Sequence, residues 1–464
     1  MSEHAVTVST ARELLAAVSA GVEDIEVRGV IVGAPGFTLA PGVSLRGGTL
    51  QFGARGVRLT SDNTLEDISI LTADEEAAIL NDTGVTDLGT LTLRNVTTRG
   101  QIVILAEDRV RGGHVQAENV RVLTADLRGR FHRPHGFGVD VLQGGFTLWN
   151  RQADPEVELT AELLEISAGT EAEPVYGSGI FVGGHGGRDG RGAGGTVHVT
   201  RLRTGEVHTD GAIPAGTPDL ISAGVFVLSG ATVDAVRTAG AVTTYGPNDM
   251  VLDNWGSVGT WIATGEVASH GPSGIGVVNF GDIDTLDVRA PIVTTGRGAR
   301  GFNLYDGTLR EARFQSIRTT GDGSIGIQIS RPMGRLAVDG DVTTSGGEGL
   351  SLVKGVQMTL PAIALSVTGT GSVDALRIGG RLVTAGANVV TLEVGGRVGE
   401  VSIAGGVRAT GAGSRAVALL DSADIDIADI DIADIDIADI DSADIDSADI
   451  DSVDIGLRSS GPRG

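Results

Sequence analysis

The feature that most constrains the fold is a 25-residue repeat in the second half of the chain. Apolar residues recur at this spacing in two columns, and glycine recurs in a third. The columns are Val242, Val267, Ile292, Ile317, Val342 and Val367; Val227, Leu252, Val277, Phe302, Ile327 and Leu352; and Gly246, Gly271, Gly296, Gly321, Gly346 and Gly371. Constant spacing over six repeats indicates a solenoid rather than a series of globular domains, because each repeat then packs against its neighbours along one axis.

The residues between these columns are typical of short β-strands. Branched apolar residues alternate with polar ones and end at glycine, as in Val342-Thr343-Thr344-Ser345-Gly346, and no segment within the repeat has helical periodicity over a helical length. Aromatic residues make up only 3 % of the chain, which favours a narrow core. We therefore predict an all-β fold, a single parallel β-helix. Each coil of about three strands pairs with the next at roughly 4.8 Å, and the Leu252 column points inward.

Three regions are predicted along the chain. Thr10-Ala11-Arg12-Glu13 forms a capping box and predicts a short helix over 11–19. Such a helix would cover the open end of the first coil, so residues 1–20 are interpreted as an N-terminal cap. The β-helix is expected over 21–420, and an acidic tail follows over 421–464.

Short motifs near the N-terminus carry a family resemblance. They are Val27-Arg28-Gly29-Val30-Ile31, Gly42-Val43-Ser44-Leu45-Arg46-Gly47 and Asn63-Thr64-Leu65-Glu66-Asp67-Ile68-Ser69-Ile70. With the capping helix, they resemble the opening of pectate-lyase-type β-helices, which implies right-handed coils. It also implies a superfamily of polysaccharide lyases, hydrolases, epimerases and phage tailspikes. The calcium-binding aspartates and catalytic arginine motif of the lyases are absent. Gly184-His185-Gly186 is similar to a polygalacturonase motif, but the accompanying aspartate motifs are missing. The resemblance therefore predicts the fold and not the catalytic residues.

Strand alternation predicts a candidate binding face. If the Leu252 column points inward, residues 253 and 255 point outward, which aligns the rings of Trp255, Phe280 and Tyr305 on consecutive coils. The same face is expected to contain Phe181, Phe226, Asp140, His185, Asp253, Asn303 and Gln328. Exposed rings beside amide and carboxylate groups suit a sugar, so we expect a solvent-facing carbohydrate platform. The alternative is that superposed coils align these rings without any ligand, or that a turn at Gly256 rotates them inward.

Titratable residues on this face are the candidates for catalysis. These are Asp140, His185 and Asp253, and the sequence does not establish that they converge. Whether the protein is an enzyme is left open; a lyase, hydrolase or epimerase would be the type. We expect Asn254 and Asn279, which have inward parity, to form a hydrogen-bonded ladder.

The segment Arg128-Gly129-Arg130-Phe131-His132-Arg133-Pro134-His135-Gly136-Phe137 interrupts the repeat. We interpret it as a protruding loop, either a lid that carries positive charge toward an acidic sugar or a solvated insertion. His132 and His135 could join Asp140 as metal ligands. Two histidines without a defined third ligand do not establish a site, so no resident metal is predicted.

The tail has a five-residue period, beginning Ala423-Asp424-Ile425-Asp426-Ile427. It resembles pentapeptide-repeat proteins, with Ile in place of Leu. Residues 421–454 contain 14 Asp and no basic residue; subtracting them from the net charge of −24 leaves −10 for the rest of the chain. The tail either extends the solenoid, with calcium bridging its carboxylates, or is dispensable repeat-expansion sequence. No other cofactor is predicted, and the acidic charge disfavours nucleic-acid partners.

Location and function follow from the remaining features. No run of about 18 apolar residues is present, so no membrane partner is expected. No secretory signal is visible, which predicts a cytoplasmic protein by default and leaves non-classical export open. The oligomeric state is also left open. We expect a carbohydrate-interacting protein, with polysaccharide processing as an option. The alternative is a non-catalytic structural or protein-interaction solenoid.

Overall fold

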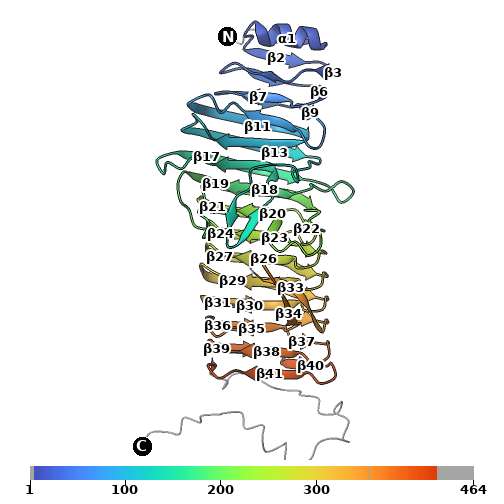
Figure 1. Ribbon diagram of the computed structural model, residues 1–464, viewed down its shortest axis with the longest axis vertical. Helices are drawn as coiled ribbons and strands as arrows, with labels where there is room; N and C mark the ends of the chain where they lie inside the picture. Colours follow the sequence, from blue (N-terminus) through green and yellow to red (C-terminus); the bar gives the residue numbers. More distant parts are fainter. Residues whose placement is uncertain (1–4, 354, 426–464) are drawn as a thin grey trace, which may run out of the picture.

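The computed structural model describes residues 5–353 and 355–425 as a stack of coils along one axis, with a single helix at the N-terminal end (Figure 1). The strands form a 24-stranded sheet, a 16-stranded sheet and a separate two-stranded hairpin. Strands of successive coils pair in parallel throughout the two large sheets. The predicted parallel β-helix is confirmed. The acidic repeats beyond residue 425 lie outside the described residues, and so do the expectations of their order and of calcium binding.

One regular coil shows how the repeat folds. It contains β24 (Ser257–Ala263) and β25 (Val267–Ser269) in the larger sheet and β26 (Ile275–Asn279) in the smaller sheet. The next coil merges the first two strands into β27 (Asp282–Thr294), which pairs with both β24 and β25, and β28 (Arg300–Leu304) pairs with β26. Each residue therefore lies beside the residue 25 positions later.

The smaller sheet carries the candidate binding face. Its main path, in order, is β4 (Phe37–Thr38), β7 (Val57–Leu59), β10 (Ala77–Asn81), β12 (Gln101–Ala106), β16 (Gly144–Asn150), β18 (Ser178–Gly183), β20 (Leu220–Val227), β23 (Asp249–Asn254), β26, β28, β30 (Ile325–Ile329), β35 (Leu365–Val367), β38 (Val390–Val394) and β41 (Arg415–Leu419).

The inner face of this sheet supplies one side of the core. Leu252, Val277 and Phe302 pair in register, and none is more than 2 % exposed. The predicted inward direction of the Leu252 column is therefore confirmed. Upstream, the residue opposite Leu252 is Val225 rather than Val227. A shift of two residues keeps the same side of the strand inward, so Val227 is also buried in the core.

Downstream, the predicted columns are wrong after residue 346. Ile327 pairs with Leu365, 38 residues later rather than 25, and Val342 pairs with Leu382, 40 residues later. The extra residues include an antiparallel hairpin, β33 (Glu348–Val353) and β34 (Val356–Pro361). The insertion places apolar residues and glycine at the spacing of the repeat by coincidence. The residues wrongly assigned to the repeat columns are Leu352, Val367 and Gly371.

The N-terminal cap forms as expected. Helix α1 (Ala11–Ser19) begins with a capping box in which Thr10 Oγ1 accepts from the Glu13 N–H at 3.2 Å, and Glu13 Oε2 accepts from the Thr10 N–H at 3.2 Å. Leu14 is fully buried against the first coils. Among the described residues no helix is long and apolar enough to cross a membrane.

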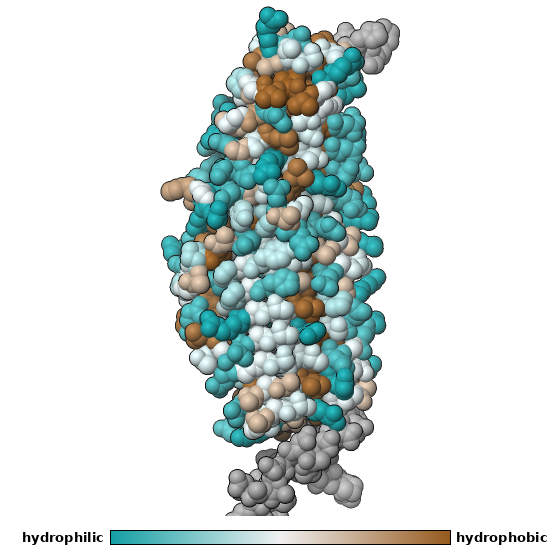
Figure 2. Space-filling view, turned by 90° about the vertical axis from the view of Figure 1, so that its right-hand side faces the viewer, coloured by the Kyte–Doolittle hydropathy of each residue, from teal (hydrophilic) through white to brown (hydrophobic). Residues whose placement is uncertain are grey.

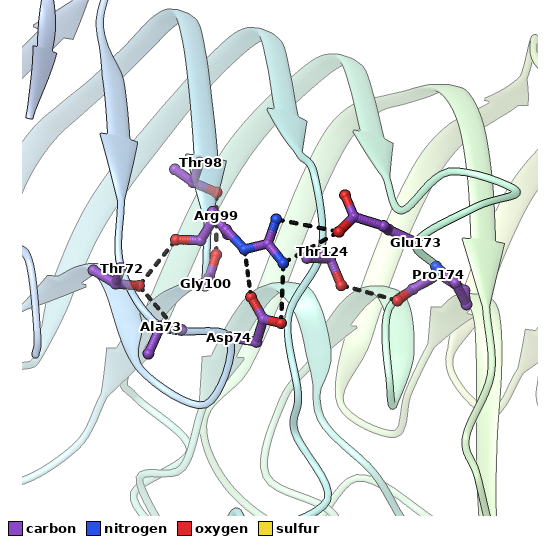
Figure 3. A network of polar contacts seen from close by, with 9 residues as sticks. All are labelled: Thr72, Ala73, Asp74, Thr98, Arg99, Gly100, Thr124, Glu173 and Pro174. Atoms are coloured by element: carbon purple, nitrogen blue, oxygen red, sulfur yellow. Dashed lines mark hydrogen bonds and ion pairs between the residues drawn. The ribbon is translucent and has the colours of Figure 1, made fainter. Parts of the chain in front are cut away.

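Polar side chains connect the turns of neighbouring coils. Arg99 Nε donates to Asp74 Oδ1 at 2.7 Å, and Arg99 Nη2 donates to Glu173 Oε1 at 3.2 Å, so one guanidinium joins turns far apart in sequence (Figure 3). Thr72 Oγ1 donates to the Arg99 carbonyl at 2.9 Å. Inside the solenoid, Asn254 Nδ2 donates to Asn279 Oδ1 at 2.8 Å, which confirms the predicted asparagine ladder.

The outer surface is mainly hydrophilic on the face that Figure 2 shows, with hydrophobic residues in separate spots. An apolar area on the outside of the smaller sheet is covered by other parts of the chain. The insertions that interrupt the repeat provide that cover over part of the smaller sheet.

Candidate functional site

The insertion over residues 128–143 folds into an antiparallel hairpin, β14 (His135–Gly136) and β15 (Val139–Val141). Its two turn residues, Phe137 and Gly138, have φ of 52° and 87°, the left-handed conformation of tight hairpin turns. β15 then pairs in parallel with the start of β20. Phe131, before the hairpin, is 92 % exposed. The expected protrusion is thus confined to the start of the insertion, and the rest folds back onto the coils.

The predicted stack of rings exists, but it does not face solvent. Ring centres lie 6.1 Å apart between Trp255 and Phe280 and 5.0 Å apart between Phe280 and Tyr305. The rings belong to a cluster outside the main core, which confirms their outward direction from the coil. Trp255 is only 4 % exposed and Tyr305 only 7 %. The prediction of a solvent-facing platform is therefore wrong.

The β14–β15 hairpin covers these rings from one side. The Phe137 ring centre lies 5.2 Å from that of Trp255 and 4.5 Å from that of Phe280. A side chain at Gly190 would collide with the Phe137 ring, so glycine is needed there for the ring to pack. A Cβ at Gly136 would lie 2.8 Å from the Trp255 indole. The hairpin backbone thus lies directly on the ring cluster.

The β33–β34 hairpin covers the rings from the other side. Arg300 Nη1 donates to the Leu352 carbonyl at 3.2 Å, and Ser351 Oγ donates to the Gly298 carbonyl at 2.7 Å. At its tip, Gly355 approaches Gly138 of the other hairpin: a Cβ there would lie 3.4 Å from the Gly138 carbonyl oxygen. The two insertions meet and together form a roof over the cluster.

The neighbouring outward column is also largely buried. Phe226 pairs with Phe181 and Asp253, and Val278 links Asp253 to Asn303 and then Gln328, as the alternation predicted. All except Gln328 are nearly inaccessible. Asn303 Nδ2 donates to Gln328 Oε1 at 2.8 Å. The proposed ligand-binding roles of Phe181, Phe226, Asn303 and Gln328 stay predictions. Asp140 does not belong to this column, because it lies in the inserted hairpin.

A pocket of about 240 Å³ lies beside the β14–β15 hairpin. We call it the cationic pocket, and it is lined by His132, Arg133, Pro134, His135, Trp149, Arg151, His185, Gly186 and Arg188. It brings the 128–137 segment together with His185, two features that the sequence singled out separately. Trp149, Arg151 and Arg188 had not been identified, because they reach the pocket only after the insertion folds back.

A histidine–carboxylate pair lies at the edge of this pocket. His135 Nδ1 lies 2.7 Å from Asp140 Oδ1, so Nδ1 carries a proton and donates it to the carboxylate. This contact fixes the orientation of the ring and leaves Nε2 to accept or donate a proton. Asp140 is therefore associated with His135, whereas Asp253, the third titratable candidate, lies under the roof.

The Arg151 guanidinium fixes the orientation of His132. Its Nδ1 lies 2.9 Å from Arg151 Nη2, and because a guanidinium can only donate, His132 Nδ1 must accept. Arg151 also forms an ion pair with Glu107 at 2.6 Å and lies over the Trp149 ring at 5.0 Å. Both candidate metal-ligating histidines thus use Nδ1 within the protein. Within residues 5–353 and 355–425, no group of three His, Cys, Asp or Glu could hold a metal ion.

Two buried side-chain nitrogen atoms belong to residues that line the pocket and are unsatisfied among the described residues. Within the described part of the chain, neither His185 Nδ1 nor Arg133 Nε has a hydrogen-bond partner. Arg133 Nη2 donates to the Arg128 carbonyl at 2.7 Å, which fixes the guanidinium while leaving Nε free. Buried polar atoms normally have partners. Arg133 Nε can only donate, and His185 Nδ1 donates in its Nδ1–H tautomer, so an acceptor from a ligand or from water would satisfy both atoms.

Comparison of the chain with protein-family models, curated proteins and solved structures found no match.

Proposed function

We propose that this protein binds an acidic glycan, with an anionic group of the sugar in the cationic pocket. The observation that carries the proposal is the pair of buried nitrogen atoms without partners among the described residues, His185 Nδ1 and Arg133 Nε. A carboxylate or sulfate can accept from both, and charge-assisted hydrogen bonds of this kind are among the stronger polar contacts. A local cluster of arginines on a chain of net charge −24 also favours a localised anion site over general attraction to polyanions.

An exposed aromatic side chain supports a sugar as the carrier of that anion. Beside the pocket, the exposed Phe131 ring lies 5.3 Å from the His132 ring. Exposed rings stack on the C–H faces of sugars. The resemblance of the N-terminal motifs to pectate-lyase-type β-helices favours a uronate-containing polysaccharide among acidic glycans.

A second candidate function is proton transfer on the bound sugar. The 2.7 Å contact between His135 and Asp140 orients the imidazole as in general acid–base sites. His135 Nε2 could then remove a proton adjacent to a uronate carboxylate, the first step of elimination or epimerisation. Incubating a galacturonate oligomer with wild type and with His135→Gln tests this by detecting unsaturated or epimerised products. If wild type forms none, the protein is a binding module.

Calorimetric titration with paired ligands tests the binding proposal. We expect a galacturonate oligomer to bind at least tenfold more tightly than its neutral methyl ester. The double variant Arg133→Gln/Arg188→Gln should lose at least tenfold in affinity for the acid. Arg318→Gln, which removes one exposed arginine outside the pocket, is the matched control and should bind like wild type. Equal binding of acid and ester, or no binding of either, would favour the alternative of a structural or protein-interaction solenoid.

A further inference from the structure

A pocket of about 230 Å³ lies on the N-terminal coils of the smaller sheet. It is formed by β4, β7 and β10, and its walls include two basic residues, Arg55 and Arg58, together with Phe37 and Leu80. The chain is described without a gap over this region. None of the residues that line the cationic pocket lines this one, so the two sites are separate. We call it the N-terminal pocket.

Strand alternation places Arg58 in the N-terminal pocket. Val57 and Leu59 on β7 are fully buried in the core, so Arg58 between them points outward. Leu80, its register partner on the next coil, also lines the pocket and supplies an apolar wall. Arg55 precedes β7 and is exposed. Two cationic side chains from the same coil therefore line one small pocket.

Arg130 of the insertion brings a third positive charge close to Arg55. Its Nε and Nη2 are buried and have no hydrogen-bond partner in the described part of the chain. Burial lowers the pKa of Arg130; Glu76 opposes this effect, and the positive charge of Arg55 adds to it. Asp126 also acts on Arg130, but its carboxylate accepts from Arg128 Nε at 2.9 Å. Arg130 is therefore a partly buried cation without an ion pair, and a nearby anion would stabilise it.

The three arginines carry more charge than the neighbouring carboxylates balance. None of them forms an ion pair with a residue that the structure describes, whereas Arg94 Nη1, on the larger sheet, lies 2.9 Å from Glu66 Oε1. The three positive charges, less the negative charge of Glu76, leave a net formal charge of +2. Like charges that lie close together repel, which favours a doubly charged anion beside them.

We propose that the N-terminal pocket binds a phosphate group, held by Arg55 and Arg58 and stabilised by the positive charge of Arg130. A phosphate dianion matches the net charge of the three arginines and Glu76, and planar guanidinium groups donate pairs of hydrogen bonds to its oxygen atoms. A carboxylate would balance only half of that charge. The group comes either from free phosphate or from a phosphate ester, whose organic part would contact Phe37 and Leu80.

Equilibrium dialysis with ³²P-labelled phosphate, at constant ionic strength and at pH 8, tests the proposal, because phosphate is mainly a dianion at this pH. We expect saturable binding that acetate at equal concentration does not displace. If glucose 6-phosphate competes at a lower concentration than unlabelled phosphate, the site takes a phosphate ester, and the reverse order assigns it to the free ion. Displacement by an equal concentration of acetate would overturn the proposal, since the site would not select a dianion.

Variants locate the bound phosphate. Arg58→Gln should weaken phosphate binding at least tenfold, and Arg130→Gln should weaken it several-fold. Arg318→Gln is the matched control outside both pockets and should bind like wild type. If Arg58→Gln does not fold, Arg55→Gln takes its place, because Arg55 is exposed. Wild-type affinity in the variant that folds would refute the site.

The cationic pocket is the competing location for the anion. Phosphate bound there would be lost in Arg133→Gln/Arg188→Gln and retained in Arg58→Gln, and that result would also overturn the proposal. The two sites share no residue. Failure of phosphate binding therefore leaves the glycan proposal intact, and failure of glycan binding leaves the phosphate site intact.

Discussion

One side of the β14–β15 hairpin is apolar and the other carries charged side chains. Val139 faces the buried ring cluster, and Gly136 leaves room there for Trp255. On the other side, His135 and Asp140 form a pair at the edge of the cationic pocket. Strand alternation accounts for this, since adjacent residues point to opposite faces. A hairpin of a few residues can therefore cover an apolar ring cluster and build a charged pocket at the same time.

Removing a ring from the apolar side should have the largest effect on stability. Because Trp255 is buried, we expect Trp255→Ala to lower the free energy of unfolding by about 3–5 kcal/mol, measured by urea denaturation. A loss below about 1 kcal/mol would mean that the roof does not close over the rings in solution.

Acidification should stabilise the protein through the buried carboxylates on β23. Asp249 accepts from Thr209 Oγ1 at 3.1 Å, and burial raises its pKa to about 7. A pKa that is higher in the folded state means that folding favours the protonated carboxyl. The contribution of Asp249 to stability therefore increases as the pH falls from above 7 toward 4. Lowering the pH from 7.5 to 5 should raise the free energy of unfolding by about 2–3 kcal/mol through protonation of Asp249.

Asp249→Asn isolates this contribution from that of other titrating groups. Urea denaturation of wild type and variant at both pH values gives the difference directly. The variant should show less stabilisation on acidification than wild type. Identical pH dependence of the two proteins would show that Asp249 does not change its charge between pH 5 and pH 7.5.

Displacing the hairpin should disturb both of its sides. A Cβ at Gly136 would lie 2.8 Å from the Trp255 ring and 2.9 Å from Gly190 Cα, so Gly136→Ala forces the backbone away. We expect a loss of about 1–3 kcal/mol in stability. Affinity for the acidic glycan should also fall, because His135 moves with the backbone. Unchanged affinity in a destabilised variant would show that the two sides are independent.

The exposed side of the insertion should contribute least to stability. Phe131 is 92 % exposed, so Phe131→Ala should change the free energy of unfolding by less than about 0.5 kcal/mol. If the ring stacks on the glycan, affinity should still fall several-fold in calorimetric titration. A larger loss of stability would show that Phe131 packs against the protein.

The regular coils could be predicted from the sequence because the signals for them are short motifs and a spacing that repeats from coil to coil. The inward Leu252 column, the Asn254–Asn279 ladder and the capping helix each follow from spacing or a short motif. The β33–β34 hairpin could not be predicted from the sequence. Leu352 has the 25-residue spacing of the repeat, although it lies in the inserted hairpin and not in a coil.

The candidate site depended on contacts that spacing does not encode. His185 and the 128–137 segment were identified, but their meeting point follows from how the insertion folds onto later coils. The burial of Trp255 has the same origin, since its cover comes from Phe137, more than a hundred residues earlier in the chain. Strand parity predicts the direction of a side chain, and only the insertions decide whether solvent reaches it.

A crystal structure of the protein with a galacturonate oligomer tests the central claim most directly. The account predicts a sugar carboxylate within hydrogen-bonding distance of Arg133 Nε and His185 Nδ1, with the β14–β15 hairpin still covering Trp255. An oligomer bound elsewhere on the coils, with those two donors still lacking a ligand, would contradict the assignment of the cationic pocket.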